Sequence, residues 1–351
     1  MDFSKISLFQ PARRLLNFFS TDLAIDLGTA NTLVYIPDQG IVLNEPSVVA
    51  VRRNTLEVIA AGKQAKEMLG KTPDSIFVER PLREGVIANF ELAQSMLRYF
   101  IKAANKNKHS LIPPRMVIGV PSGITQVELR AVKEAAKQAG AREVHIISEP
   151  MAAAIGASIQ IHEARGNMIV DIGGGTTEVA VISLKGGIFR QSVRIGGDEM
   201  DRAIVNYVKR KYNLLIGERT AELAKITIGT VLLDHELQYM DVKGRDLVSG
   251  VPKTITLSSA EVHESLLETI SHIIDLIHIA LENAPAEVSS DLVDNGIVLA
   301  GGGALLRNLD KLVSSETGLP VKIAETPLLC VVLGAGKVLQ NIDFYKDALI
   351  I

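Results

Sequence analysis

Two short stretches of the sequence repeat one pattern of residues that is suited to holding a polyphosphate. Residues 26–36 read DLGTANTLVYI and residues 171–181 read DIGGGTTEVAV, and an ungapped alignment places Asp26 on Asp171 and Gly28 on Gly173. Glycines let backbone N–H groups approach phosphate oxygens, Thr and Asn side chains add donors, and an aspartate can hold a hydrated divalent cation. Either stretch alone fits an ordinary hairpin. The ungapped pair favours two loops that grip one nucleotide from both sides.

The elements that position these loops follow from apolar runs and turn residues. Each aspartate ends an apolar run and β-branched residues follow each turn, which predicts a strand, a tight turn and a second strand in both places. Strands then alternate with helices, two of which begin with capping boxes at Thr125 and Ser258. The predicted helices are residues 62–70, 89–106, 125–140, 151–159, 196–212, 258–285 and 305–312, and one that contains Gly334 and Gly336. This pattern predicts mixed sheets covered by helices in two similar domains, with the two loops facing each other across a cleft.

Two further loops could complete a nucleotide site. Residues 301–304 follow a predicted buried strand at 297–300, and bare backbone at a strand-to-helix junction can pack against a phosphate, a ribose or a base. A plain tight turn explains the three glycines equally well. Glu149 follows a strand at 144–147, and a carboxylate there can orient a water for attack on a terminal phosphate. A helix cap or a surface acid is the alternative, and position alone leaves the role of Glu149 open.

Composition narrows the class of protein. The chain has 351 residues, 47% hydrophobic and 22% charged, which is enough for two globular domains. A net charge of −3, without a basic stretch interleaved with aromatics, argues against a nucleic-acid ligand. Cys330 is the only cysteine, so we expect no disulfide framework, a reducing setting and a buried inert thiol. The sequence has no Walker motif, no G-x-S-x-G and no zinc-helix histidine pair, which excludes those chemistries.

Two segments have the composition of membrane contacts. No apolar run could span a bilayer and no signal peptide is present, but residues 1–20 combine phenylalanines and leucines with Lys5, Arg13 and Arg14. A short amphipathic helix from Pro11 could lie in a membrane interface or dock on the protein's own core. We favour the membrane, because the first hairpin begins directly afterwards. Residues 111–112 could form a second contact with the membrane or pack inward. The apolar candidates are Phe3, Leu15, Leu16, Phe18, Phe19, Leu111 and Ile112.

The motifs resemble those of the actin, sugar-kinase and heat-shock-chaperone ATPase superfamily and, within it, the MreB family of bacterial actin homologues. The resemblance extends from about Asp22 to Gln340 and rests mainly on residues 25–32, 120–123, 149–154, 171–177 and 299–303. It implies an α/β, actin-like ATPase fold with two RNase-H-like domains, each with an inserted smaller subdomain, and a nucleotide cleft between them. The implied parts are a membrane-binding segment at 1–21, a first domain at 22–148 with an insertion at about 42–82, a second domain at 149–324 with an insertion at about 190–250, and a C-terminal segment at 325–351 that returns to the first domain.

The resemblance also implies roles for single residues. Asp26 and Asp171 would face a hydrated Mg²⁺, while Glu149 and Thr176 would position the attacking water. The residues implied to line the phosphates, ribose and adenine of ATP are Gly28, Thr29, Ala30, Asn31, Gly173, Gly174, Gly175, Thr220, Ala221, Glu222, Leu223, Lys225, Gly301, Gly302, Gly303 and Ala304. The two hairpins are thus an unequal pair, since only the second carries a group implied in hydrolysis.

The implied function is that of an ATPase, dependent on ATP and Mg²⁺, whose filaments lie in the cytoplasm on the inner face of the cytoplasmic membrane and organise cell-wall synthesis and rod shape. The implied partners are further copies of the chain, the membrane surface and the cell-shape proteins MreC, MreD and RodZ. A small-molecule kinase would need a further carboxylate to activate a hydroxyl, and a chaperone-like ATPase would need a peptide-binding domain. The sequence shows neither. Residues 230–239 are more apolar than a linker and receive no role.

Overall fold

The computed structural model describes residues 22–104, 112–233 and 236–350. The chain divides into two compact units. Within the described residues, unit 1 comprises 22–104, 112–120, 124–148 and 332–350, and unit 2 comprises 121–123 and 149–331. The chain therefore passes from unit 1 into unit 2 for three residues, returns, and enters unit 2 again at Glu149. Each unit is described by itself.

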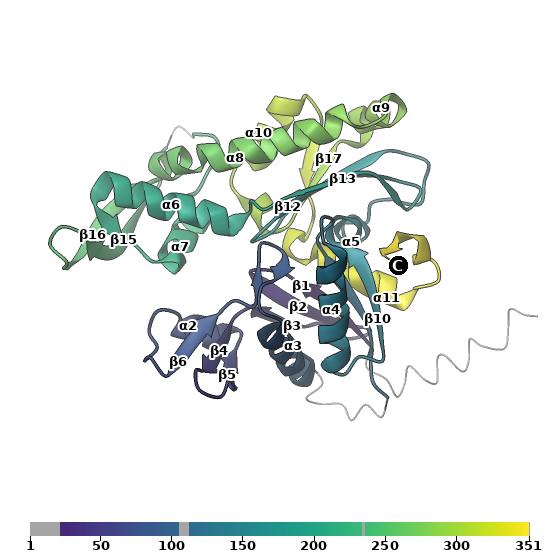
Figure 1. The fold of residues 1–351 in the computed structure, drawn as a ribbon. Helices are drawn as coiled ribbons and strands as arrows, with labels where there is room; N and C mark the ends of the chain where they lie inside the picture. The colour runs from purple at the N-terminus through teal and green to yellow at the C-terminus, as the bar shows by residue number, and fades with distance from the viewer. Residues whose placement is uncertain (1–21, 105–111, 234–235, 351) are drawn as a thin grey trace, which may run out of the picture. The chain divides into compact units, whose positions relative to one another are not determined.

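Unit 1 is built on a six-stranded mixed sheet in the order β19-β10-β9-β1-β2-β3. The strands are β1 (Leu23–Leu27), β2 (Asn31–Ile36), β3 (Gly40–Pro46), β9 (Arg115–Val120), β10 (Glu143–Ser148) and β19 (Leu349–Ile350). Helices α3 (Phe90–Ala104) and α4 (Gln126–Gln138) pack together on one face of the sheet (Figure 1). α3 buries Leu92, Met96 and Phe100, which recur every four residues and so form one apolar stripe. Helix α11 (Cys330–Gln340) begins with two residues of unit 2 and, from residue 332 onward, completes unit 1.

A small sheet is inserted between β3 and α3. It has the order β5-β4-β6, from β4 (Val49–Arg52), β5 (Val58–Ala61) and β6 (Ile76–Glu79), and carries helix α2 (Lys63–Met68). Val48, Ala50, Ala60 and Ala65 form its own small core. A two-stranded ribbon of β7 (Leu82–Arg83) and β8 (Val86–Ile87) follows.

Unit 2 repeats this plan around a five-stranded sheet in the order β13-β12-β11-β17-β18. Its strands are β11 (Asn167–Ile172), β12 (Thr177–Ser183), β13 (Gly186–Val193), β17 (Ile297–Ala300) and β18 (Val321–Ile323). Its helices are α5 (Glu149–Gly156), α6 (Gly197–Tyr212), α7 (Glu218–Ile228), α8 (Ser259–Glu282), α9 (Ala286–Asn295) and α10 (Leu309–Thr317). A second sheet, β14-β15-β16, joins β14 (Leu214–Leu215), β15 (Tyr239–Asp246) and β16 (Pro252–Ser258).

The internal repeat seen in the sequence holds at the level of strand register. Asp26 pairs with Leu33 across the antiparallel strands β1 and β2, and Asp171 pairs with Glu178 across β11 and β12. The ungapped alignment places Leu33 on Glu178, so the two hairpins have the same register. Each first strand also has a parallel neighbour, β9 in unit 1 and β17 in unit 2. The predicted pair of hairpins is therefore confirmed, and both aspartates occupy the same place in their sheets.

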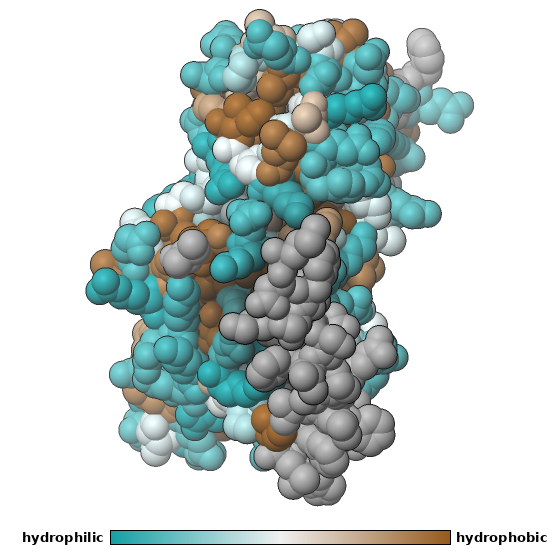
Figure 2. Space-filling model, turned by 90° about the vertical axis from the view of Figure 1, so that its right-hand side faces the viewer, coloured by the Kyte–Doolittle hydropathy of each residue, from teal (hydrophilic) through white to brown (hydrophobic). Residues whose placement is uncertain are grey.

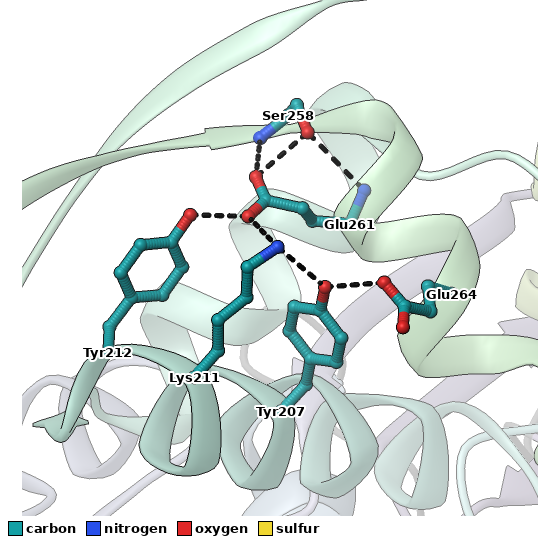
Figure 3. A network of polar contacts seen from close by, with 6 residues as sticks. All are labelled: Tyr207, Lys211, Tyr212, Ser258, Glu261 and Glu264. Carbon is teal, nitrogen blue, oxygen red and sulfur yellow. Dashed lines mark hydrogen bonds and ion pairs between the residues drawn. The ribbon is translucent and has the colours of Figure 1, made fainter.

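A network of polar side chains joins the end of α6 to the start of α8, two helices that lie side by side (Figures 1 and 3). The Glu261 carboxylate forms an ion pair of 2.8 Å with Lys211 and accepts a hydrogen bond from the Tyr212 hydroxyl. Its other oxygen accepts from the Ser258 backbone N–H at 2.8 Å, while the Glu261 N–H donates to the Ser258 hydroxyl at 3.3 Å. Ser258 and Glu261 thus form the predicted capping box.

The network shifts the protonation equilibria of its members. Burial would raise the pKa of Glu261, but the hydrogen bonds that it accepts outweigh burial and lower the pKa to about 2. The bonds to Glu261 and Tyr207 raise the pKa of Lys211. Tyr207 in turn donates to Glu264 at 2.6 Å. At neutral pH the Lys211–Glu261 pair is therefore fully charged and fixes how α6 meets α8.

Several elements differ from the predictions. The capping box at Thr125 and Glu128 is present, but the apolar Val127 does not join the core and is 78% exposed in the first turn of that helix. Helix α9 was not predicted, because Pro285 was interpreted only as a stop although it is also a good residue to precede a helix. Residues 302–305 form a short 3₁₀ turn, and the α-helix begins only at Leu309.

The unexplained segment after α7 gains a structural role. Thr230 pairs with Arg307, and the Val231 N–H donates to the Arg307 carbonyl at 3.1 Å. Val231 is buried in the core of unit 2, which accounts for the apolar start of the segment, whereas Leu233, Leu237 and Tyr239 are exposed. Among the described helices none is long and apolar enough to cross a bilayer. The face drawn in Figure 2 is mainly hydrophilic, with hydrophobic side chains gathered in limited patches.

Candidate functional site

The turn of the β1–β2 hairpin is braced through the carbonyls of Gly28 and Ala30, and two of its N–H groups have no acceptor among the described residues. The Ser47 hydroxyl donates to the Gly28 carbonyl at 2.6 Å, and the Ser47 N–H donates to the Ala30 carbonyl at 3.0 Å. The Gly85 N–H donates to the Thr29 hydroxyl at 2.9 Å. Within the described residues the N–H groups of Thr29 and Ala30 donate no hydrogen bond. Such N–H groups in a turn bind anions well.

Asp26 lies at the end of β1, beside this turn. Burial raises its pKa to about 7. A carboxyl group that loses hydration without gaining a positive neighbour is a typical place for a cation, because the cation's charge would restore the ionised form. Asp26 is therefore suited to a cation, and the free N–H groups beside it are suited to an anion that is bound to the same cation.

The β11–β12 hairpin has a different brace. The Gly173 N–H donates to the Thr176 carbonyl at 2.8 Å and closes the turn. The N-terminus of α6 then packs on the turn, since the Gly197 N–H donates to the Gly173 carbonyl at 3.0 Å and the Asp198 N–H to the Gly174 carbonyl at 2.8 Å. A Cβ on Gly196 would lie 2.7 Å from both of those carbonyls, so only glycine allows this approach.

This brace again leaves anion-binding groups free. The N–H groups of Gly174 and Gly175 donate no hydrogen bond in the part of the chain that the structure describes. The positive end of the α6 dipole lies against the same turn. Thr176 is buried beside it. The second hairpin is therefore the better anion site of the two.

The triple glycine lies against the end of β11 and does not open an α-helix. Gly301 has φ +78°, and a Cβ there would lie 2.5 Å from the Asp171 carboxylate and 2.3 Å from the Ile172 carbonyl. A Cβ on Gly303 would lie 2.2 Å from the Ile172 side chain. The expectation of a helix N-terminus at this loop was wrong. The glycines are needed because the loop passes directly over Asp171, which is 5% exposed.

Helix α7 carries five of the candidates, which point in different directions. Ala221 is buried in the core of unit 2, Leu223 is exposed, and Thr220 and Glu222 are half-buried. The Lys225 ammonium donates to the Gly197 carbonyl at 2.8 Å and forms an ion pair of 2.8 Å with Asp201. Lys225 thus fixes α7 to the start of α6, next to the turn at Gly174.

Asp201, the partner of Lys225, was not found from the sequence. Burial raises its pKa to about 6, and the nearby Lys225 opposes the rise. A second buried acid, Glu178 on β12, was also missed, as was the brace at Ser47. Glu178 could have been noticed, because it is the single charged residue in an otherwise uncharged strand, TEVAVIS. Ser47 and Asp201 have no comparable signal in their sequence surroundings.

Glu149 is the first residue of α5 and is half-buried. α5 packs on β11 and β12. Ile172 and Val179 belong to the core cluster under α8, so alternation along the strands places Asp171 on the opposite face, the one that α5 meets. The carboxylates of Glu149 and Asp171 thus belong to the same side of the unit 2 sheet.

The remaining candidates are the metal ligands, the membrane-contact residues and Cys330. No group of three or more His, Cys, Asp or Glu residues capable of binding a metal directly occurs among the described residues. A cation held mainly through water, as expected from the sequence, needs no such group. Ile112 is half-buried. The membrane candidates Phe3, Leu15, Leu16, Phe18, Phe19 and Leu111 lie outside the described residues. Cys330 is buried, as predicted, and its thiol donates to the Thr326 carbonyl.

Comparison with solved structures defines the class of protein. The chain superposes on MreB5 of Spiroplasma citri bound to ADP with a TM-score of 0.87 and 40% identity, over 93% of this chain and 98% of that chain. It matches a MamK double helical filament with a TM-score of 0.79, over 92% of this chain and 99% of that one, but at 22% identity, which bears on the fold alone. The fold is the actin-like ATPase fold.

Comparison of sequences defines the family. The model of the MreB/Mbl protein family matches residues 20–347. The cell shape-determining protein MreB of Escherichia coli (strain K12) is 53% identical over 337 residues, 95% of this chain and 97% of that protein. The cell shape-determining protein Mbl of Bacillus subtilis (strain 168) is 48% identical over 325 residues, 93% of this chain and 97% of that protein. The chain belongs to the MreB/Mbl family.

Proposed function

We propose that this chain is an ATPase that polymerises into filaments and helps to determine cell shape. The observation that carries the proposal is the pair of braced hairpins, whose free N–H groups lie beside Asp26 in unit 1 and Asp171 in unit 2. The Spiroplasma citri relative has been solved with ADP and with AMPPNP. The related MreB and Mbl proteins are named as cell shape-determining.

The residues present fit a nucleotide with Mg²⁺. The N–H groups of Thr29 and Ala30 in one hairpin, and of Gly174 and Gly175 in the other, would bind phosphate oxygens. The remaining candidates in these loops and in the 301–304 loop would line the nucleotide by their backbone. Mg²⁺ would supply charge neutralisation on the phosphates, held through water by the two aspartates. Thr220, Glu222 and the exposed Leu223 would border the ribose and the base.

The residues proposed for hydrolysis are Glu149 and Thr176. Glu149 opens α5 on the face of the sheet that carries Asp171, where its carboxylate can accept a proton from a water and orient it. The Thr176 hydroxyl, next to the Gly174–Gly175 donors, would hold the same water. Lys225, by contrast, would position the turn at Gly174 indirectly, through its hydrogen bond to the Gly197 carbonyl and its ion pair with Asp201.

The filament would lie on the inner face of the cytoplasmic membrane. We propose that residues 1–21, together with Leu111 and Ile112, contact the membrane, and that further copies of the chain and proteins of the MreC, MreD and RodZ kind are the protein partners. This part of the proposal rests on the amphipathic pattern of residues 1–20 and on family membership.

Sedimentation after addition of nucleotide tests the proposal. We expect the chain to pellet with Mg²⁺ and ATP, and to pellet more with anionic liposomes. Asp171→Asn should lose nucleotide binding and pelleting together, whereas Asp241→Asn should keep both, because Asp241 bonds only Thr256 on the exposed face of β15. A chain that stays in the supernatant under all conditions but phosphorylates a metabolite would be a kinase, and the filament proposal would be wrong.

A further inference from the structure

Glu178 is a buried acid that the fold does not require. It is 1% exposed on β12, two residues after Thr176. The equivalent residue of the first hairpin is Leu33, which is 5% exposed and has the same strand register. An apolar side chain therefore suits this position of the repeat. Burying a carboxyl group costs desolvation free energy that a leucine avoids, and a hydrogen bond offsets that cost only in part, so the acid at Glu178 calls for an explanation other than stability.

The side chain of Glu178 reaches the chain segment that crosses between the two units. Residues 121–123 belong to unit 2, although β9 before them and residue 124 after them belong to unit 1. The backbone N–H of Ser122 donates to the Glu178 carboxylate at 2.7 Å. A Cβ on Gly123 would lie 3.7 Å from the Ser192 side chain on β13. These three residues, which we name the crossover, are thus attached to unit 2 through β12 and β13.

The hydrogen bond between Glu178 and the crossover lies in the same cross-strand row as Asp171, at the proposed phosphate site. Asp171, Glu178 and Ser192 are paired across three adjacent strands, so their side chains share one face of the sheet. Asp171 is at the proposed nucleotide end of this row and Ser192 is beside the crossover. Asp171 is thus connected to the Ser122 N–H by one strand pairing, to Glu178, and one hydrogen bond.

We propose that Glu178 is a positioning residue that ties the phosphate-binding hairpin of unit 2 to the crossover, so that the bound nucleotide controls how firmly the crossover is held. The inference rests on the proposed nucleotide site. Glu178 would connect the nucleotide-binding hairpin to the crossover. Leu33 in the first hairpin cannot do so, because leucine has no hydrogen-bond acceptor.

Hydrogen exchange on the full chain, with Mg²⁺ and either ADP or AMPPNP, tests the inference. In the natural chain, exchange at the Ser122 N–H should differ between the two nucleotides. Glu178→Leu copies the residue of the first hairpin and removes the acceptor. There the Ser122 N–H should exchange about ten- to a hundredfold faster, the range expected when a buried N–H loses its acceptor, and the nucleotide difference should vanish. Nucleotide binding is measured separately on each variant.

Matched variants separate positioning from simple destabilisation. Glu178→Gln keeps an oxygen acceptor and Ser122→Ala keeps the N–H, so both should retain the nucleotide difference. Ser122→Pro removes the donor from the other side. Because proline has no N–H, exchange is followed at the neighbouring Gly123 N–H in the natural chain and in this variant, where its nucleotide difference should vanish even if Glu178→Leu fails to fold. A nucleotide difference that persists in Glu178→Leu or Ser122→Pro would overturn the inference while leaving the proposed function intact. Failure of the natural chain to bind either nucleotide would instead refute the proposed function.

Discussion

Replacing Glu261 by Gln should weaken unit 2 by an amount that depends on pH. The carboxylate holds Lys211 and Tyr212 of α6 and caps α8 (Figure 3). Gln can still accept the bond from the Ser258 N–H, but it cannot carry the negative charge that faces Lys211. The variant therefore isolates the charged part of the network from the capping part.

The pKa of Glu261 sets the size of the effect. Its pKa is about 2 in the folded chain against 4.5 for the ordinary group. The difference corresponds to at most about 3 kcal/mol of stability at pH 6, since one pKa unit is worth about 1.4 kcal/mol and solvent around the half-exposed Lys211 screens the pair. Because the folded pKa is the lower one, this stability is present above pH 4.5 and is lost as the pH falls towards 2. The gap between the natural chain and the variant should shrink to about half of its pH 6 size at pH 3.

Hydrogen exchange of the buried α8 amides, such as those of Ile273 and Ile277, measures this gap in unit 2 alone. Glu264→Gln is the matched control, because Glu264 is one turn further along α8 and receives a single hydrogen bond, from Tyr207. Its cost should be about 1 kcal/mol or less. Equal losses in the two variants, or a Glu261→Gln gap that does not change between pH 6 and pH 3, would refute the reasoning.

Three further outcomes are expected. Gly301→Ala should displace the Asp171 carboxylate and abolish nucleotide binding. Gly250→Ala is the control, because Gly250 has nearly the same φ of +77° but open space around it, and it should cost about 1 kcal/mol of stability and keep binding. Equal binding losses in the two variants would contradict the role of the 301 loop. Glu149→Gln should retain ATP but lower turnover by about 10²–10⁴-fold in a phosphate-release assay, and unchanged turnover would remove Glu149 from the mechanism. A chain that begins at Asp22 should lose most liposome binding in a flotation assay, and undiminished binding would make residues 1–21 a docking segment.

The sequence was sufficient wherever the signal is local. Both hairpins, the capping boxes at Thr125 and Ser258 and the stripe of α3 follow from residues within a few positions of one another. The repeat also related two distant parts of the chain, because the two similar hairpin sequences have the same strand register. Family resemblance supplied the class of protein before any coordinates.

Errors arose where distant segments decide the outcome. The triple glycine looked like a helix start, but its conformation is imposed by Asp171 and Ile172, about 130 positions away in the chain, over which it must pass. Val127 fits the apolar spacing of α4 and is nonetheless exposed in the first turn. The contacts of Lys225 with Asp201 and the Gly197 carbonyl likewise have no signal in the sequence around it.

The sequence by itself determined which groups of this protein can do chemistry: two aspartates at strand ends, glycine turns beside them and a glutamate before an alanine-rich helix. Those assignments depend only on residues close in the sequence, because turn geometry and apolar periodicity are set by neighbouring residues. Only the tertiary structure decided which N–H groups remain free and which acids are buried, because burial and hydrogen-bond partners depend on every segment that packs around a group. Glu178 is the clearest case, since a strand position that the repeat fills with leucine holds a carboxylate whose partner comes from the crossover.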